Sequence, residues 1–478
     1  MIQAYPDQPS VTSGDVLTLH VSTDAPRFCV DFYRHGEGLA LKGTSEWFTG
    51  QSRPAHLPYQ DWGRDDTGLR GEALPAWPEY RFPIPVDWTS GVYVAMLAEG
   101  DLAGARTDTP DTRSLDARDS RALFVVQSPC PATRSSILYK LLLLTYQVYN
   151  QVLRQAFDPA TQEGGWSLYT VPSPDCLPKP VPSSVTIRRP GGGTGGTPWD
   201  IFNSDPFDPT PRQTFAHWDA PFITWLEKNG YCMDYCTDLD VHGDERGNLL
   251  GAYRLLLCAG HDEYWSDAMR SNVDAYVHGG GNVAFFSGNT SWYQVSFDGE
   301  FSFRRVRPWS DTALPHKPEN LITGVSYRNG GERRQGDPLI PIGYRVQYAD
   351  HWVYERTGLH EGQMFGDGAG QHLVGYECDG AHFDRNDLVK GGPVRPTGDD
   401  GTPLDFVILG IGDVSQAGWG LGNKAATMGV YVHNGTVFTA STTDWARVVA
   451  SGTAPTVEQI TRNVVDRLSK LTNRATAV

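Results

Sequence analysis

The sequence has few cysteines and no long apolar run. Seven cysteines in 478 residues is an odd, low count, which argues against a disulfide framework and favours reduced thiols. No apolar run approaches the roughly 20 residues that span a bilayer, and residues 1–20 contain no basic segment followed by an apolar core. These absences predict a cytoplasmic protein with no membrane partner.

Basic residues are also fewer than acidic ones. The chain has 40 Lys and Arg against 56 Asp and Glu, a formal net charge of −16. Nucleic acids and anionic membranes are bound by basic surfaces, so neither is expected as a partner. We expect a small, uncharged substrate instead. The length and the 39% hydrophobic content allow a sizeable core and more than one domain.

Residues 1–127 have the pattern of an all-β domain. Short runs with alternating polarity, such as 16–21, 28–33 and 92–97, are separated by Gly, Pro and Asp turns. This spacing is typical of an antiparallel β-sandwich and predicts an immunoglobulin-like N-terminal domain.

Residues 128–478 have the alternating pattern of an α/β domain. Near-continuous apolar runs predict strands of a parallel sheet that is covered on both faces. Between them lie segments with helical spacing. Strands are expected at 137–144, 231–236, 254–258, 282–287, 406–409, 427–433 and 436–440, and helices at 215–228, 264–277 and 457–471. We therefore predict an α/β plus all-β protein whose second domain has a flavodoxin- or amidotransferase-like parallel sheet.

Residues 293–400 lose this periodicity and are rich in Gly, Asp, Arg and Pro. Long segments of this kind inside a compact domain are uncommon and are frequently functional loops or lids. We expect a long irregular insertion with little core of its own.

The segment His261-Asp262-Glu263 is the strongest candidate for an active site. It follows an apolar strand and precedes helical spacing, and open α/β sheets bind ligands beyond the carboxyl ends of their strands. One of the carboxylates could instead cap the following helix. Cys258, three residues before His261, is a second candidate because amidotransferase-type enzymes place a nucleophile at such an elbow. Its place inside the apolar run favours a buried core thiol.

Four segments carry a resemblance to a known family. They are Thr145-Tyr-Gln-Val-Tyr-Asn150, Trp166-Ser-Leu-Tyr169, Gly260-His-Asp-Glu-Tyr264 and Gly280-Gly-Asn-Val-Ala-Phe-Phe-Ser-Gly-Asn289. In content and order they resemble the large (beta) subunit of N,N-dimethylformamidase. The likeness extends to residues 85–93, 442–445 and 460–464, so it covers most of the chain.

This resemblance implies a mononuclear ferric iron, Fe(III), held by two tyrosinates and one glutamate, that hydrolyses an amide C–N bond. Glu263 matches the carboxylate ligand and Tyr169 one of the phenolates. For the other phenolate the sequence offers Tyr149 and Tyr146, and Tyr149 is the preferred match. A hard trivalent cation prefers anionic oxygen ligands, so the implied donor set is chemically coherent.

The resemblance also implies two catalytic residues. His261, close to the metal, would orient water or protonate the departing amine. Asn289 would hydrogen-bond the substrate carbonyl or the attacking water. One metal can both acidify water and polarise a carbonyl, which are the two requirements of amide hydrolysis.

Partners and alternative functions remain open at this point. The family's large subunit is longer and works with a small helical partner subunit, so such a partner and a homo-oligomer both stay open. A carbohydrate-active protein could use Glu263 with Asp262 or Asp444 as its carboxylate pair. A non-catalytic ligand-binding protein could also keep the same scaffold.

Overall fold

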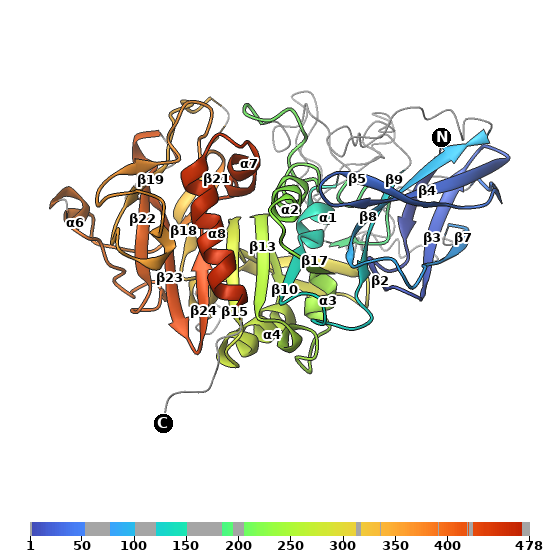
Figure 1. Cartoon of the computed structure of the whole chain (residues 1–478), viewed down its shortest axis with the longest axis horizontal. Coiled ribbons are helices and arrows are strands. Elements are labelled where there is room, and N and C mark those ends of the chain that lie inside the picture. The colour runs from blue at the N-terminus through green and yellow to red at the C-terminus, as the bar shows by residue number, and fades with distance from the viewer. Residues whose placement is uncertain are drawn as a thin grey trace, which may run out of the picture.

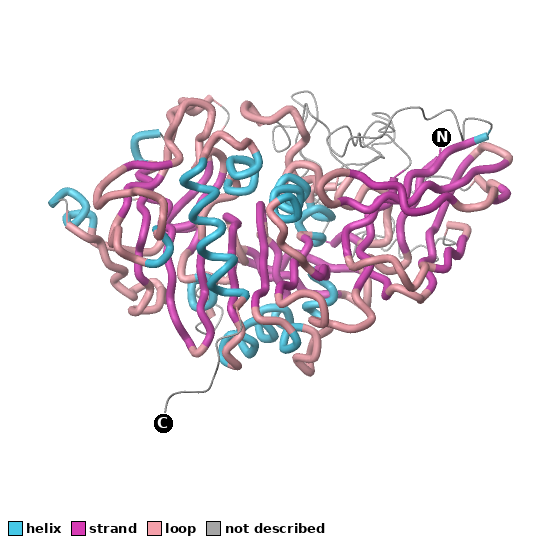
Figure 2. The backbone as a smooth tube through the Cα atoms, in the orientation of Figure 1, coloured by secondary structure: helices cyan, strands magenta, loops and turns pink. Residues whose placement is uncertain are grey.

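The computed structural model is a mixed α/β protein in which strands outnumber helices (Figures 1 and 2). In Figure 1 a β-sandwich lies at one end of the long axis, and a nine-stranded sheet with its helices and two smaller sheets extends toward the other end. The structure describes residues 2–52, 77–100, 121–150, 184–194, 205–311, 317–334, 336–390, 392–417, 419 and 424–470. Tyr169 lies outside these ranges.

The N-terminal part is a sandwich of two sheets. One sheet has the order β1 (Ile2–Pro6), β3 (Val16–Thr23), β7 (Glu79–Pro83), and the other β2 (Ser10–Thr12), β9 (Arg121–Gln127), β8 (Gly91–Glu99), β4 (Arg27–His35), β5 (Leu39–Thr44), with β6 (Phe48–Thr49) beside β4. Alternate side chains of β4, including Phe28 and Val30, pack against Leu17 and Leu19 of β3 in one core. The predicted strands at 16–21, 28–33 and 92–97 are confirmed. One pair, β2 with β9, is parallel, so the sandwich is not purely antiparallel.

The large sheet follows in the chain, since β9 ends at Gln127 and β10 begins at Ile137. Its spatial order is β12 (Asp234–Thr237), β10 (Ile137–Leu141), β13 (Leu255–His261), β15 (Asn282–Gly288), β24 (Gly435–Thr439), β23 (Ala425–His433), β22 (Val407–Asp413), β19 (Tyr344–Val346), β20 (Met364–Phe365). The first five strands are parallel, and the pairs from β24 to β20 are antiparallel. The sheet is therefore mixed, not all parallel as expected. A single residue, Asn434 with φ +62°, joins β23 to β24, and so short a turn permits only an antiparallel pair.

Helices cover both faces of the parallel strands. Residues of α2 (Asp219–Lys228), α7 (Trp445–Ala450) and α8 (Pro455–Ser469) share one core with Leu255 and Leu257 of β13. Residues of α3 (Asp238–His242) and α4 (Asp267–His278) share a second core with Leu256 and Cys258. Because both sides of β13 are buried, its sequence is apolar from Leu255 to Gly260 and does not alternate. Among the described residues, no helix has the length and apolarity needed to cross a bilayer.

Two predicted boundaries near the site differ from the structure. The expected strand at 137–144 ends at Leu141, and helix α1 (Leu143–Val148) begins two residues later. The expected helix from 264 starts only at Asp267, because Tyr264–Ser266 forms the short strand β14. Ser266 caps that helix, its Oγ accepting a hydrogen bond from Met269 N at 3.1 Å. Asp262 and Glu263 are therefore not its caps.

The region 293–400 is more ordered than expected. It contains β16 (Tyr293–Phe297), β17 (Ser302–Pro308), β18 (Ser326–Glu332), β19, β20, β21 (Glu377–Gly380), α5 (Asn320–Thr323) and α6 (Arg385–Lys390). Two further small sheets form there, one of β11 (Ser184–Thr186), β17, β16 and β14, the other of β18 and β21. Tyr344 and Val346 of β19 belong to the main core. β19, β20 and β21 have only 3, 2 and 4 residues, and strands this short leave no periodicity in the local sequence.

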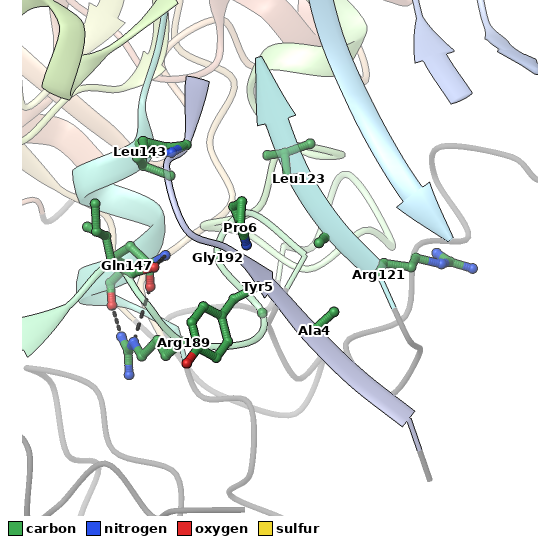
Figure 3. Close-up of a pocket in the computed structure, with 13 residues that line it drawn as sticks. Ala4, Tyr5, Pro6, Arg121, Leu123, Leu143, Gln147, Arg189 and Gly192 are labelled. Atoms are coloured by element: carbon green, nitrogen blue, oxygen red, sulfur yellow. Dashed lines mark hydrogen bonds between the residues drawn. The ribbon is translucent and has the colours of Figure 1, made fainter. Parts of the chain in front are cut away.

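The sandwich meets the α/β part along a closely packed seam (Figure 3). Tyr5 of β1 and Leu123 of β9 face Leu143 and Gln147 of α1 across it. Arg189 donates from Nε to Gln147 Oε1 at 3.1 Å, and burial lowers the pKa of this arginine to about 9. The space between them is only about 10 Å³, which holds at most a water molecule. This seam is a packing interface with no room for a ligand.

Candidate active site

The carboxyl end of β13 places His261 at the centre of the candidate site. Gly260 has φ +77°, and a Cβ at this position would lie 2.6 Å from Cβ of Trp218, so only glycine fits. Beyond it, the carbonyl oxygens of Asp262 and Glu263 accept hydrogen bonds from Ser291 N at 2.8 Å and Tyr293 N at 3.0 Å. These two backbone bonds tie the turn to residues 291–293, and His261 is fully buried.

Tyr149 and Glu263 lie together, as the sequence predicts. Tyr149, which ends helix α1, donates from its hydroxyl to Glu263 Oε2 at 2.9 Å. Thr145 of the same helix accepts a hydrogen bond from Glu263 N at 3.3 Å. Helix α1 therefore positions both the phenol and the carboxylate. The third predicted ligand, Tyr169, falls outside the described residues.

Tyr146 is engaged elsewhere. Its hydroxyl donates to Asp219 Oδ2 in the core on the α2 side, where Tyr139 also donates to Asp219 Oδ1 at 2.7 Å. Burial raises the pKa of Asp219 to about 7, although both tyrosine hydrogen bonds act to lower it. This geometry favours Tyr149 over Tyr146 as the phenol of the site.

Two carboxylates converge on one imidazole nitrogen. Nε2 of His261 lies 3.1 Å from Glu263 Oε2 and 2.8 Å from Glu377 Oε2. Burial alone lowers the pKa of His261, but Glu377 and Glu263 outweigh it and raise this pKa to about 10. On the other side of the ring, Nδ1 donates to Gln213 Oε1 at 2.8 Å. His261 is thus held from both nitrogens.

Asn289 completes the cluster from the end of β15. Its Nδ2 donates to Glu377 Oε2 at 3.2 Å and lies 3.2 Å from His261 Nε2. Its backbone has φ +50°, a left-handed conformation that asparagine tolerates better than most residues. Its Oδ1 is buried with no hydrogen-bond partner among the described residues, so an acceptor is available at this point.

The middle residue of the turn, Asp262, points away from this cluster. Its Oδ1 accepts from Lys140 Nζ at 2.8 Å, and the same Nζ lies 2.5 Å from Asp238 Oδ1. Burial by itself lowers the pKa of Lys140, whereas Asp238 and Asp262 raise it well above the ordinary lysine value. All three side chains are buried, so this triad is part of the core.

Asp444 also has a structural role. Its Oδ2 accepts from the backbone N of Gly375 at 3.2 Å and of Tyr376 at 2.9 Å, and its Oδ1 accepts from Arg447 at 2.9 Å. It therefore fixes the segment that leads into Glu377. Neither Asp262 nor Asp444 lines the cavity that Glu263 faces, which removes the carboxylate pairs expected for a carbohydrate-active protein.

A cavity of about 170 Å³ opens in front of the cluster. It is large enough for a small molecule, and its walls are mainly aromatic and acidic. Arg212 lies 3.7 Å from the ring centre of Tyr376 and supports this wall from outside the cavity. The lining residues are Tyr149, Glu263, Asn289, Trp292, Tyr293, Tyr327, Glu332, Tyr376 and Glu377.

Several of these residues are not predicted from the sequence, and Glu377 is the most important of them. It lies in the region expected to be irregular, on a strand of four residues. One signal was present, since Leu373–Asp379 places two carboxylates inside a largely apolar run, and buried charges of this kind are often functional. Gln213, Tyr327, Glu332 and Tyr376 carry no comparable signal.

The donor set suits a hard metal ion. Tyr149 and Glu263 present a phenol and a carboxylate oxygen 2.9 Å apart, and both become anionic ligands on binding. In the part of the chain that the structure describes, no three His, Cys, Asp or Glu side chains form a metal-binding group by themselves. Of the predicted set of two tyrosines and one glutamate, Tyr149 and Glu263 fit this chemistry, and Tyr169 lies outside the described residues.

Cys258 has no catalytic arrangement. The side chain is fully buried in the core on the α4 side of the sheet, and burial raises the pKa of its thiol well above the ordinary value. A thiol that resists ionisation is a poor nucleophile. The interpretation of Cys258 as a core residue is the one that the geometry favours.

The fold and the cluster together define a mixed α/β protein with a buried His-Glu-Tyr site at the carboxyl ends of parallel strands. Residues 33–456 match the family described as N,N-dimethylformamidase beta subunit-like, C-terminal, and the chain belongs to that family. The family predicted from the sequence motifs is therefore confirmed.

Two individual proteins are similar to parts of the chain. The N,N-dimethylformamidase beta subunit of Alcaligenes sp is 28% identical over 218 residues, covering 39% of this chain and 27% of that protein. The chain thus spans about a quarter of the length of this relative. A cytoplasmic protein of Salmonella typhimurium, compared by structure, covers 52% of this chain and 87% of its own at 11% identity, with a TM-score of 0.29. A score this low carries no argument about fold or function.

Proposed function

We propose that this protein is a hydrolase that cleaves the C–N bond of a carboxamide or lactam. The observation that carries the proposal is the convergence of Glu263 and Glu377 on Nε2 of His261, with Tyr149 bound to Glu263. Such a cluster combines anionic ligands with a group that can move a proton, inside a cavity of small-molecule size. Membership of the dimethylformamidase-like family supports the same chemistry.

We propose further that Tyr149, Glu263 and Tyr169 hold a mononuclear ferric iron. Two phenolates and one carboxylate balance the charge of a trivalent ion. When bound, the ion would supply a Lewis acid that polarises the amide carbonyl and lowers the pKa of water. The geometry of Tyr149 and Glu263 supports this assignment.

The chain's own residues account for the remaining steps. Asn289 would orient the substrate amide, because its Oδ1 is an available acceptor and its Nδ2 a donor beside Glu377. His261 would hold the proton on Nε2 and pass it to the departing amine. Gln213, which accepts from Nδ1 at 2.8 Å, keeps the ring in that orientation.

The finer fold assignments belong to the proposal as well. We infer a flavodoxin- or amidotransferase-like sheet, because β10 and β12 stand in reversed order before β13, β15 and β24. Ligands bind where strand order reverses, and His261 and Tyr149 follow the two strands, β13 and β10, that flank this point. The immunoglobulin-like type of the sandwich, the boundary of the two domains near residue 128 and closure of 293–400 as a lid are further proposals.

The proposed partners and location follow from the similar protein and from the net charge. The relative in Alcaligenes sp is named a beta subunit, which supports a partner subunit or a homo-oligomer for this chain. We propose a cytoplasmic protein that binds neither nucleic acid nor membranes, in keeping with its net charge of −16.

The first experiment is to measure iron content and the visible spectrum of the purified protein. Tyrosinate bound to ferric iron gives a charge-transfer colour, so a coloured protein with about one iron per chain would support the site. Release of amine from N,N-dimethylformamide, acetamide and valerolactam would then test the reaction. A colourless protein that stays inactive after addition of iron would contradict the proposal.

Substitution of His261 with glutamine is expected to lower kcat about 100-fold or more while iron remains bound. General acid–base catalysis is worth about this much, and glutamine preserves the hydrogen bond to Gln213 but carries no titratable proton. Steady-state kinetics and iron analysis of the same preparation check both parts. Full activity in the iron-bound variant would remove the proton-transfer role.

The paired variants Tyr149→Phe and Tyr146→Phe separate the two candidate phenols. Tyr149→Phe is expected to lose the colour and the activity with little change in Tm. Tyr146→Phe is expected to keep iron but to lower the free energy of unfolding by about 1–3 kcal/mol, because buried Asp219 loses a donor. Spectra and denaturant titrations of both proteins provide the measurement. If only Tyr146→Phe lost iron, the assignment of Tyr149 would be wrong.

A further inference from the structure

The walls of the cavity have an unusual composition. Of the nine described residues that line it, three are Glu, four are Tyr, one is Trp and one is Asn. None of these described lining residues is Lys, Arg or His. An anionic substrate would find no cationic side chain on this described wall, which disfavours amides that carry a carboxylate of their own.

Glu332 and Glu377 stand directly opposite each other. They are register partners in the antiparallel pair of β18 and β21, and both line the cavity. Like charges in directly opposite positions destabilise a sheet. Burial and the charge of Glu377 both raise the pKa of Glu332. A positive group in the cavity would relieve this repulsion.

Three cationic or titratable side chains lie near Glu332 and Glu377, but none of them enters the cavity between the aromatic rings. Arg334 lies 3.1 Å from Glu332 Oε1, but its side chain is 77% exposed and stands on the solvent side. Arg212 is tied to Asp205 at 3.4 Å and lies against the ring of Tyr376. His261 is held between Glu263 and Glu377. None of the three lines the cavity.

Aromatic rings flank the acidic pair. Trp292 lies 5.2 Å from the ring of Tyr327 and 6.0 Å from that of Tyr293. Tyr327 and Trp292 line the same cavity as the carboxylate of Glu332. Aromatic faces beside a carboxylate are the usual surroundings of a bound ammonium group, since ring quadrupole and charge both attract it.

We propose that the substrate is an amide that carries a protonated amine. The ammonium group binds among Glu332, Trp292 and Tyr327. The amide lies against Tyr149, Glu263 and Asn289, lining residues of the same cavity, of which Glu263 and Asn289 adjoin His261. This assignment rests on the proposed amide hydrolysis and defines its substrate class. It replaces the neutral substrate expected from the net charge, because the local wall, not the whole surface, contacts the substrate.

Three probes of similar length test the assignment: N-acetylputrescine, which is cationic, N-pentylacetamide, which is neutral, and N-acetyl-4-aminobutyrate, which is anionic. We expect kcat/KM of the iron-loaded enzyme to be at least about tenfold higher for the cation than for the neutral probe, with the anion poorest. In Glu332→Gln this preference should fall below about threefold. Glu245→Gln, which removes a charge from an exposed residue, should leave it unchanged.

The outcomes separate the two proposals. Hydrolysis without preference for the cation would overturn the substrate class while supporting amide hydrolysis. If no probe is hydrolysed, calorimetry decides: tighter binding of N-acetylputrescine than of N-pentylacetamide, lost in Glu332→Gln, supports the cation site, and equal or no binding overturns it. Trp292→Leu serves where Glu332→Gln does not fold, and should reduce the same preference without changing charge.

Discussion

Replacing Glu263 with glutamine is expected to remove bound iron and to lower amide hydrolysis by about a thousandfold or more, with Tm nearly unchanged. Glutamine has the shape of glutamate but lacks its charge, so it can still accept from Tyr149 but is a weak ligand for a trivalent ion. It also leaves Glu377 as the one carboxylate on His261 Nε2 within the described cluster. Iron analysis, visible absorption, amine release and thermal unfolding of one preparation give the four readouts.

The matched control is Glu245→Gln, which makes the same chemical change at an exposed residue outside the cavity. It should retain iron, colour and turnover. An active Glu263→Gln protein without iron would disprove the metal site. An inactive Glu263→Gln protein that kept its iron and colour would instead move Glu263 from ligand to a role in orienting His261.

Replacing Lys140 with methionine is expected to lower the free energy of unfolding by about 3–5 kcal/mol. Methionine preserves most of the volume, but it leaves the carboxylates of Asp238 and Asp262 buried without their common partner. Removal of one member of a buried ion pair costs this much because the remaining charge stays in a poorly solvating interior. Denaturant titration at constant pH measures the change.

Lys317→Met provides the comparison. Lys317 pairs with Asp267 at 3.3 Å, but the two side chains are 53% and 58% exposed. Exposed pairs contribute about 0–1 kcal/mol, so this variant should unfold close to the parent. Equal effects of the two substitutions would mean that the Lys140 triad contributes no more than a surface pair. Adding Asp238→Asn and Asp262→Asn to Lys140→Met should restore part of the lost stability.

The sequence was most informative where strand and site coincide. β13 is a long apolar run that ends abruptly in His261, Asp262 and Glu263, so the strand end and its polar residues are both visible locally. Helix α1, by contrast, could not be recognised in the sequence, because every one of its residues is buried. Leu143 and Leu144 continue the apolar run of β10, and a helix that is buried on all sides has no amphipathic period to reveal it.

Non-local contacts explain most of what could not be predicted. Glu377 reaches His261 from more than a hundred residues further along the chain, through a strand of four residues whose partner β18 is itself distant. The strand of Glu377 is too short to show alternation, and the seven residues of β18 are mostly polar or Gly and do not alternate. The different roles of the two carboxylates in the turn could not be predicted either. No local pattern distinguishes Asp262, which binds Lys140, from Glu263, which binds Tyr149.

The separate roles of the residues in the turn 261–263 have an evolutionary consequence. The outer two positions of the turn depend on Glu377 and Tyr149, whereas the middle position depends on Lys140 and Asp238 in the core. Proteins with this scaffold could therefore acquire a new reaction by changes at positions 261 and 263 and their cavity neighbours. Asp262 could stay unchanged, because it stabilises the core and does not contact the cavity. Within three adjacent residues, substitutions at 261 and 263 would alter the cavity, whereas a substitution at 262 would alter the stability of the fold.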